Sequence, residues 1–494
     1  MSRHRGAWRT ALAVVMAVTG AVALPAADAV ADSGPATAEL RDDFNGDGYA
    51  DLVVAAPSAT VGGKTQAGFV AVRYGTEYGW VTGAKKVFTQ NSAGVPGTAE
   101  KGDQFGSALT TADLDKDGYA DLIVGVGGED TDSAGTDSGY VEVLWGSPNG
   151  LSGASSLATG RSAYDRLGAA GHLAVADVDG DGATDVVTVQ NEHDLRVLKG
   201  PFGQDGSYQG EQVVKDQYSS RVLDLAAGDV NGDGITDVAA TENDTDEYDS
   251  RRVVYWLGTH QGLTPYTLVY DIDGAGLQGG ENLAIGDIDR DGFDDIVVGR
   301  AVDGYDSDLD NPYVKGGRIA WIPGTADGPD GVRAVFLNQD RPGVPGTAEK
   351  GDHFGTDVQI GDVDGDGYPD VLTGVPGEDL GSVADAGAVV LLHGSAAGLT
   401  GTGAQVVTQS TGNVPGTAEK GDFFGKAVHL GDSNGDGLAD VAVGAPGENG
   451  NSGFVWHFKS SPNLLVTPNA TGAFGNTWLG TDGTNAKFGS NFSY

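Results

Sequence analysis

The stretch DVDGDGYPD, residues 362–370, decides the fold, because close copies of it occur seven times along the chain. The copies follow the pattern D-x-[DN]-x-D-G-x-x-D, and each is followed by an apolar run such as DVLTGV (370–375). In an EF-hand, a longer loop that closes on a glutamate leads into a helix. Here the valine-rich run predicts a β-strand after the loop.

Each copy has the residues of a calcium site. Calcium takes about six to eight oxygen ligands, which alternate residues of a tight loop supply. We expect side-chain oxygens from positions 1, 3 and 5, a backbone carbonyl from position 7, and a bidentate Asp at position 9. Position 6 is always Gly, where we expect φ > 0. The alternative is a set of acidic Asx-turns without metal. In that case the near-adjacent carboxylates within each of the seven loops would repel one another.

The predicted cofactor is therefore Ca²⁺, up to seven ions, one per loop. The expected ligands are Asp43, Asn45, Asp47, Tyr49 and Asp51; Asp113, Asp115, Asp117, Tyr119 and Asp121; Asp177, Asp179, Asp181, Ala183 and Asp185; Asp229, Asn231, Asp233, Ile235 and Asp237; Asp287, Asp289, Asp291, Phe293 and Asp295; Asp362, Asp364, Asp366, Tyr368 and Asp370; and Asp432, Asn434, Asp436, Leu438 and Asp440.

Composition supports an exported, metal-loaded β protein. The chain has no cysteine and 82 glycines in 494 residues. Its formal charge of −41 disfavours nucleic acid as a partner.

The N-terminal residues 1–31 are predicted to be a secretory signal peptide. They begin with a basic stretch, continue with 15 mostly apolar residues (10–24) and end in small residues. A membrane anchor is the alternative, but the run falls short of the roughly 20 residues that span a bilayer. We expect a linker over 32–41 and no membrane insertion.

The spacing of the loops predicts a β-propeller. Successive loops lie 70, 64, 52, 58, 75 and 70 residues apart. A typical unit has a strand before the loop (105–114), one after it, a third such as GYVEVLWG (139–146) and a fourth such as QVVTQ (405–409). The first loop lacks an upstream FG strand, whereas the last residues, AKFGSNFSY (486–494), supply one without a loop. The fold class is therefore all-β: one seven-bladed propeller over 42–494, its ring closed by the C-terminal strand pairing with the first blade, and monomeric.

The repeat resembles a known family. FGTDVQIGDVDGDGYPDVLTGVPGED (354–379) and FGKAVHLGDSNGDGLADVAVGAPGEN (424–449) resemble the FG-GAP repeat of the integrin α-chain N-terminal propeller and its bacterial relatives. The middle departs from it: Leu167-Gly168 stands in for FG, and units four and five lack FG and GAP but keep the loop. The resemblance implies calcium held between the first two strands of a blade.

Because successive strands of a blade run in opposite directions, successive loops emerge on opposite sides of the ring. The acidic loops emerge with the loops between strands three and four, and the remaining loops emerge on the other side. This second side holds GVPGTAEKGD (94–103 and 343–352) and NVPGTAEKGD (413–422). The resemblance implies that the metal-free face carries ligand and subunit contacts. The candidate binding residues are Glu100, Lys101, Asp103, Glu349, Lys350, Asp352, Glu419, Lys420 and Asp422, although the three Asp also suit a turn-shaping role.

Catalytic motifs are lacking in the sequence, and we assign no catalytic residue. The histidines and the strand-three tryptophans are expected to pack, and Tyr78 and Trp80 are the candidates for stacking on a sugar. We therefore predict a calcium-binding module that binds an extracellular protein or cell-surface ligand, as in adhesion. The alternatives are a lectin-like propeller that binds carbohydrate, and an enzyme that acts on extracellular polysaccharide through an axial active site.

Overall fold

Short apolar runs after the acidic loops form the second strand of every blade. In β1 (Leu52–Ala56), β5 (Asp121–Val126) and β21 (Asp370–Val375), every residue is buried. Such strands are buried on both faces because each lies between two neighbouring blades, which explains why they read as continuous apolar runs. The computed structural model describes residues 42–216, 218–243, 251–303, 314–462 and 471–493. The predicted signal peptide and linker lie outside these residues.

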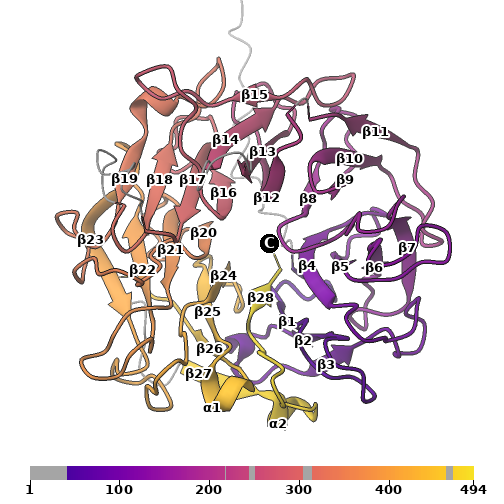
Figure 1. Cartoon of the computed structure of the whole chain (residues 1–494). Coiled ribbons are helices and arrows are strands. Elements are labelled where there is room, and N and C mark those ends of the chain that lie inside the picture. The colour runs from indigo at the N-terminus through magenta and orange to yellow at the C-terminus, as the bar shows by residue number, and fades with distance from the viewer. Residues whose placement is uncertain (1–41, 217, 244–250, 304–313, 463–470, 494) are drawn as a thin grey trace, which may run out of the picture. The chain divides into compact units, whose positions relative to one another are not determined.

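The chain divides into two units, and the second, Leu40–Tyr494, contains the strands. It forms seven four-stranded antiparallel sheets. Figure 1 shows these sheets arranged one after another around a centre. Counted from the inner strand, blade 1 has β28 (Asn491–Phe492), β1, β2 (Phe69–Arg73) and β3 (Lys85–Phe88). Blade 2 has β4 (Phe105–Ala112), β5, β6 (Tyr140–Leu144) and β7 (Ala154–Thr159). Blade 3 has β8 (Leu173–Ala176), β9 (Asp185–Gln190), β10 (Asp194–Lys199) and β11 (Gly210–Val214).

The remaining blades have the same order. Blade 4 has β12 (Arg221–Gly228), β13 (Asp237–Asn243), β14 (Arg251–Trp256) and β15 (Thr267–Leu268). Blade 5 has β16 (Asn282–Gly286), β17 (Asp295–Arg300), β18 (Arg318–Ile322) and β19 (Val335–Leu337). Blade 6 has β20 (Val358–Gly361), β21, β22 (Ala388–His393) and β23 (Thr400–Val407). Blade 7 has β24 (Ala427–Gly431), β25 (Asp440–Ala445), β26 (Phe454–Phe458) and β27 (Thr471–Gly475).

The described residues contain little helix. The helical turns are η1 (Gly79–Val81), η3 (Gly331–Arg333), α1 (Glu448–Asn451) and α2 (Asn476–Leu479). In this part of the chain, no helix is long and apolar enough to cross a membrane.

The ring closes as predicted from the C-terminal FG. β28 pairs antiparallel with β1, opposing Phe492 to Val54, and the inner strands of all seven blades contact one another in succession. Figure 1 shows this strand, in yellow, beside the indigo first blade. Phe488 and Phe492 are fully buried in the core between blades 7 and 1. A β-sheet edge is thereby paired rather than left open.

The FG and GAP motifs interlock neighbouring blades. In blade 7 the N–H of Gly425 (FG) donates to the carbonyl of Gly444 (GAP). The carbonyl of Gly425 also lies against Gly374, the GAP glycine of blade 6, where an added Cβ would stand 1.9 Å from it. Gly425 has φ +88°, a conformation that favours glycine. These glycines therefore let two backbones approach more closely than any side chain allows.

The cores lie between blades. Trp145, Trp256, Trp321 and Trp456 all join these inter-blade clusters, which confirms their expected packing role. Blades 3 to 5, where the motif is degenerate, are still complete four-stranded sheets.

Candidate functional site

The seven acidic loops share one hydrogen-bonded conformation. In each, the position-1 carboxylate accepts from the N–H of the position-6 glycine at 2.8–3.1 Å. All seven of these glycines have φ between +81° and +92°, as expected from the sequence. The position-5 carboxylate accepts from the N–H of position 7, as Asp47 does from Tyr49 at 3.2 Å. The backbone is thus wound around the side chains of positions 1, 3 and 5.

The position-9 carboxylate ties each loop to a second loop of its blade. In blade 2, Asp121 accepts from the N–H of Leu114 at 2.9 Å and from that of Gly146, after strand three, at 2.8 Å. The same two bonds, at 2.7–3.2 Å, hold Asp51, Asp185, Asp237, Asp295 and Asp370. All these carboxylates are buried. We call this pair of bonds the clamp. It was not anticipated from the sequence, which indicated only that position 9 is a metal ligand.

Blade 7 varies the clamp. Asp440 accepts from the N–H of Ser460 at 2.8 Å and from the amide Nδ2 of Asn434 at 2.7 Å. The position-3 side chain of this loop is therefore turned toward position 9.

The side chains of the loops suit a hard cation. In four loops, sets of three oxygens lie within 4.8 Å of one another: Asp113, Asp115 and Asp121; Asp177, Asp179 and Asp185; Asp287, Asp289 and Asp291; and Asp362, Asp364 and Asp366. Burial raises the pKa of Asp51 to about 8 and that of Asp121 to about 7, and neighbouring loop carboxylates add to both shifts. A cation stabilises the ionised form of such groups. Carboxylate, amide and carbonyl oxygens are the donors that calcium prefers, so the residues fit this ion.

Three loops have a basic side chain of their own beside them. The Nζ of Lys199 lies 2.7 Å from Asp179 Oδ2 in blade 3, and the Nζ of Lys459 lies 3.1 Å from Asp436 in blade 7. In blade 6, His393 Nδ1 lies 3.1 Å from Asp370 and 3.3 Å from Asp364. Lys199 and His393 occupy the last position of strand three, and Lys459 directly follows it. His393 was expected only to pack, and its contact with the loop could be found only from the fold.

The remaining loops meet at the other end of the blade, as predicted. The predicted binding residues lie in three rim loops, residues 94–103, 343–352 and 413–422. In blade 2, the N–H of Gly128, after strand two, donates to the carbonyl of Asp103 at 3.0 Å. Asp103 Oδ2 in turn accepts from the N–H of Glu100 at 2.5 Å. Asp352 and Asp422 make the same two bonds, so the turn-shaping role of these three Asp is confirmed.

A glutamate from the loop after strand two lies beside each of these Asp residues. The side chains of Asp422 and Glu448 hydrogen-bond to each other. Burial, together with the neighbouring carboxylates, raises the pKa of Asp103 to about 6 and that of Glu129 to about 7. By contrast, Lys101, Lys350 and Lys420 of the rim loops are exposed.

One candidate for stacking on a sugar is wrong. Trp80 is 1% exposed, and its indole N–H donates to the carbonyl of Ala50 at 2.8 Å. It packs against His429 and His457 in the core between blades 7 and 1, so both histidines have the packing role expected of them. Tyr78 is 64% exposed. The turn at Gly79 directs Trp80 into the core and leaves Tyr78 exposed at the surface.

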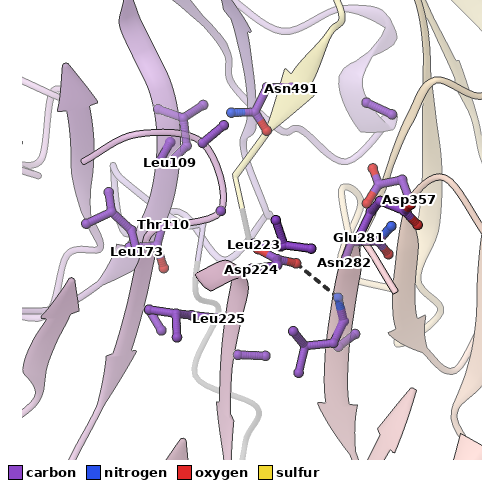
Figure 2. Close-up of a pocket in the computed structure, with 18 of the residues that line it drawn as sticks. Leu109, Thr110, Leu173, Leu223, Asp224, Leu225, Glu281, Asn282, Asp357 and Asn491 are labelled. Carbon is purple, nitrogen blue, oxygen red and sulfur yellow. Dashed lines mark hydrogen bonds between the residues drawn. The ribbon is translucent and has the colours of Figure 1, made fainter. Parts of the chain in front are cut away.

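A cavity of about 410 Å³ lies on the axis between the inner strands (Figure 2). The polar side chains around it join adjacent blades. Asp224 Oδ2 accepts from the N–H of Leu283 at 3.0 Å, the dashed line in Figure 2, and Asn282 Nδ2 donates to the carbonyl of Thr356 at 2.7 Å. Asp357 Oδ2 accepts from the N–H of Val428 at 2.8 Å. These groups pair the edges of inner strands, which is a structural role.

Two family models match the chain. The FG-GAP repeat matches residues 40–72, 105–144, 354–392 and 424–458. The FG-GAP-like repeat matches 177–240 and 229–298. Together these ranges contain all seven acidic loops, and the second model covers the middle blades whose FG and GAP are degenerate.

Curated proteins match parts of the chain. Phosphatidylinositol-glycan-specific phospholipase D of Rattus norvegicus is 34% identical over 39% of this chain and 22% of its own length. Integrin alpha-5 of Xenopus laevis is 28% identical over 39% of this chain and 17% of its own. Integrin alpha-6 of Gallus gallus is 28% identical over 57% and 24%. The matched region thus spans less than a quarter of each relative. With seven four-stranded blades and these repeats, the chain is an integrin-alpha-like β-propeller built of FG-GAP repeats.

Proposed function

We propose that the chain is a secreted β-propeller that binds calcium in its acidic loops and a protein or surface ligand through its opposite face. The likeness to integrin alpha chains carries the protein-binding part of this proposal. Secretion rests on the signal peptide expected at residues 1–31.

Calcium has a structural role in this proposal. In four acidic loops, three carboxylate oxygens lie within 4.8 Å of one another, and the position-9 carboxylates are buried. Ligands held in this way repel one another until a cation binds, so binding contributes to folding. Extracellular modules bind calcium with Kd of about 10⁻⁴–10⁻³ M.

The ligand-binding role falls to the rim loops. Their three copies present Lys101, Lys350 and Lys420 as exposed cations on rigid turns. Functional residues commonly lie on loops that a rigid scaffold positions. In this proposal the acidic loops make internal hydrogen bonds and bind metal. The opposite face, which carries the rim loops, is the one that contacts a partner.

A capture experiment tests the proposal. The immobilised chain is exposed to extracellular surface proteins with and without calcium, and we expect calcium-dependent capture of specific proteins. The triple variant Lys101→Ala, Lys350→Ala, Lys420→Ala is expected to lose them. A control carries Glu77→Ala and Gln261→Ala, exposed positions on the side of the acidic loops. Capture that the rim variant keeps and the control loses would refute the choice of face, and no specific capture would refute the binding role.

Because a basic side chain lies beside three of the acidic loops, we expect these loops to bind calcium more weakly than the other acidic loops. Lys199 neutralises Asp179 and competes with a cation, so Lys199→Met is expected to tighten calcium binding by the blade 3 loop. A partly buried ion pair is worth about 1 kcal/mol, which corresponds to roughly three- to tenfold in Kd. Calorimetric titration with calcium measures the change.

The matched control is Lys101→Met, an exposed lysine on the opposite face. It is expected to leave the affinities of the acidic loops unchanged. Equal affinities in both variants and the parent chain would mean that Lys199 does not compete for the loop.

A further inference from the structure

A second cavity, of about 230 Å³, lies at the end of the blades that carries the rim loops. Its wall contains Arg166, in the loop before β8, His172, next to the start of β8, and Glu192, between β9 and β10. Arg221, the first residue of β12, is the remaining charged residue of the wall. We call this cavity the arginine pocket. Because successive strands alternate in direction, all four positions emerge on the same side as the rim loops.

The arginine pocket lies beside the axial cavity of Figure 2. Pro57, Ser107, Ala170 and Leu223 line both cavities, and Leu223 is labelled in that view. Pockets that enclose a drug-sized ligand have volumes of about 300–1,000 Å³, so the arginine pocket is small. It therefore suits a single side chain or chain end that a larger partner inserts from the rim-loop face.

Hydrogen bonds of the backbone hold the wall in place. The N–H of Arg166 donates to the carbonyl of Asp137 at 3.1 Å, and that of Val222 donates to the carbonyl of Glu192 at 2.9 Å. Because a carbonyl only accepts, the Nε2 of His172 donates to the carbonyl of Val222, at 3.1 Å, and so ties blade 3 to blade 4. The charged side chains therefore extend from fixed backbone positions, as in other sites that a rigid scaffold presents.

Neither arginine is neutralised by a strong ion pair. The guanidinium of Arg166 has no hydrogen bond or ion pair with any residue in the described ranges. Arg221 Nη2 lies 3.9 Å from Glu192 Oε1, and these two side chains are 54% and 37% exposed. An ion pair this long and this exposed contributes little stability. Both guanidinium groups are thus available to an incoming anion.

The pocket has one net positive charge. Arg166 and Arg221 supply two positive charges and Glu192 one negative charge, and all three act on the charge state of His172. Burial lowers the pKa of His172 to about 4, so its ring is neutral near pH 7. On a chain with 70 acidic and 29 basic residues, a pocket of this sign is opposite to the charge of the chain as a whole.

A carboxylate matches this arrangement. Planar guanidinium groups bind carboxylates and phosphates through paired N–H donors. A phosphate monoester carries about −1.5 to −2 charges at pH 7, whereas a carboxylate carries a single charge, which balances the net charge of the pocket. The small volume also favours the smaller group. A protein partner can present a carboxylate as an Asp or Glu side chain or as its C-terminus.

We propose that the arginine pocket binds a carboxylate of the protein partner through the guanidinium groups of Arg166 and Arg221. This inference rests on the proposed function, because it concerns the same face, and it adds the chemical group that the partner inserts. It also adds two residues that were not among the candidates from the sequence.

Peptide binding tests the proposal. The full chain, in calcium, is incubated with two arrays of short random peptides, one with amidated and one with free C-termini. If the ligand is a side chain, we expect the bound peptides of the amidated array to be enriched in Asp or Glu. If it is a chain end, we expect binding only to the array with free C-termini. Enrichment of neutral or basic amidated peptides, or no selective binding to either array, would overturn the proposal.

Variants then locate the contact with the peptide that binds best. Arg166→Met and Arg221→Met keep an apolar stem but remove the guanidinium, and each is expected to weaken binding about tenfold or more. Replacing the carboxylate of the peptide by an amide is expected to weaken binding to the parent chain equally, and to change little in the two variants. Fluorescence anisotropy measures the Kd values, and melting curves check that the variants fold.

The matched control is Lys64→Met. Lys64 is an exposed cation between β1 and β2, on the same face but outside the pocket. It is expected to leave the Kd unchanged. Equal weakening by Lys64→Met and by the arginine variants would mean that the charge of the face attracts the peptide, and would overturn the pocket.

The capture experiment separates this inference from the proposed function. Capture that is lost in the triple lysine variant but kept in Arg166→Met and Arg221→Met would leave the rim loops as the ligand site and refute the pocket. No specific capture by the parent chain would refute the proposed function itself.

Discussion

Replacing Asp121 by alanine is expected to lower the free energy of unfolding by about 2–6 kcal/mol. The carboxylate is 1% exposed and accepts from two backbone N–H groups, those of Leu114 and Gly146. Alanine leaves both donors buried without an acceptor, and each such group costs about 1–3 kcal/mol. The bonds also join the acidic loop to the turn after strand three, so the loss is expected to loosen that end of blade 2. Denaturant unfolding measures the effect.

The same experiment in a chelator separates the clamp from metal binding. Asp115, at position 3, accepts from the amide of Gln204 at the surface of the blade, so Asp115→Ala is the matched control. In calcium both variants are expected to be destabilised. In EDTA the deficit of Asp115→Ala is expected to shrink, because its main loss is the ion, whereas that of Asp121→Ala persists. Equal stability of Asp121→Ala and the parent chain in EDTA would contradict the clamp.

Replacing Phe492 by alanine is expected to cost about 3–5 kcal/mol, as for other large-to-small changes in a core. Its ring is fully buried between blades 7 and 1, and its backbone pairs with Val54 in the closing strand. The substitution therefore weakens both the packing of β28 and the closure of the ring. Thermal and denaturant unfolding measure the loss.

The control for ring closure is Phe423→Ala. Phe423 is 38% exposed and lies in the loop before the inner strand of blade 7. Its loss is expected to cost well under half as much. If both substitutions had the same effect, the closing strand would contribute no more than a surface residue.

The repetition of the chain made the architecture predictable. Seven copies of one loop predicted seven blades, and the unmatched FG at Phe488 predicted which strand closes the ring. The position-6 glycines were predictable too, because their φ depends only on the local turn. The degenerate middle blades form complete sheets because their strands kept the apolar runs that pack between blades.

Features that depend on distant residues were not predictable. The clamp on Asp121 needs Gly146, which is 25 residues away in the sequence. Lys199 and His393 face an acidic loop only because strand three ends beside it. Trp80 looked like a surface aromatic in a polar loop, but the turn at Gly79 directs its ring into the core between blades 7 and 1. In each case the local sequence is compatible with either environment, and the packing of the blade decides.

The dependence of stability on calcium is the sharpest test of the structural role proposed for the acidic loops. The melting temperature and metal content of the purified chain are measured with about 1 mM calcium and after chelation. At tenfold excess over Kd, each occupied loop adds about 1.4 kcal/mol. Summed over all seven loops, this is about 10 kcal/mol and predicts that chelation lowers the melting temperature by about 10 °C. Calcium bound by elemental analysis and such a fall in melting temperature are the results expected. An unchanged melt in EDTA, with no calcium in the purified protein, would contradict the account.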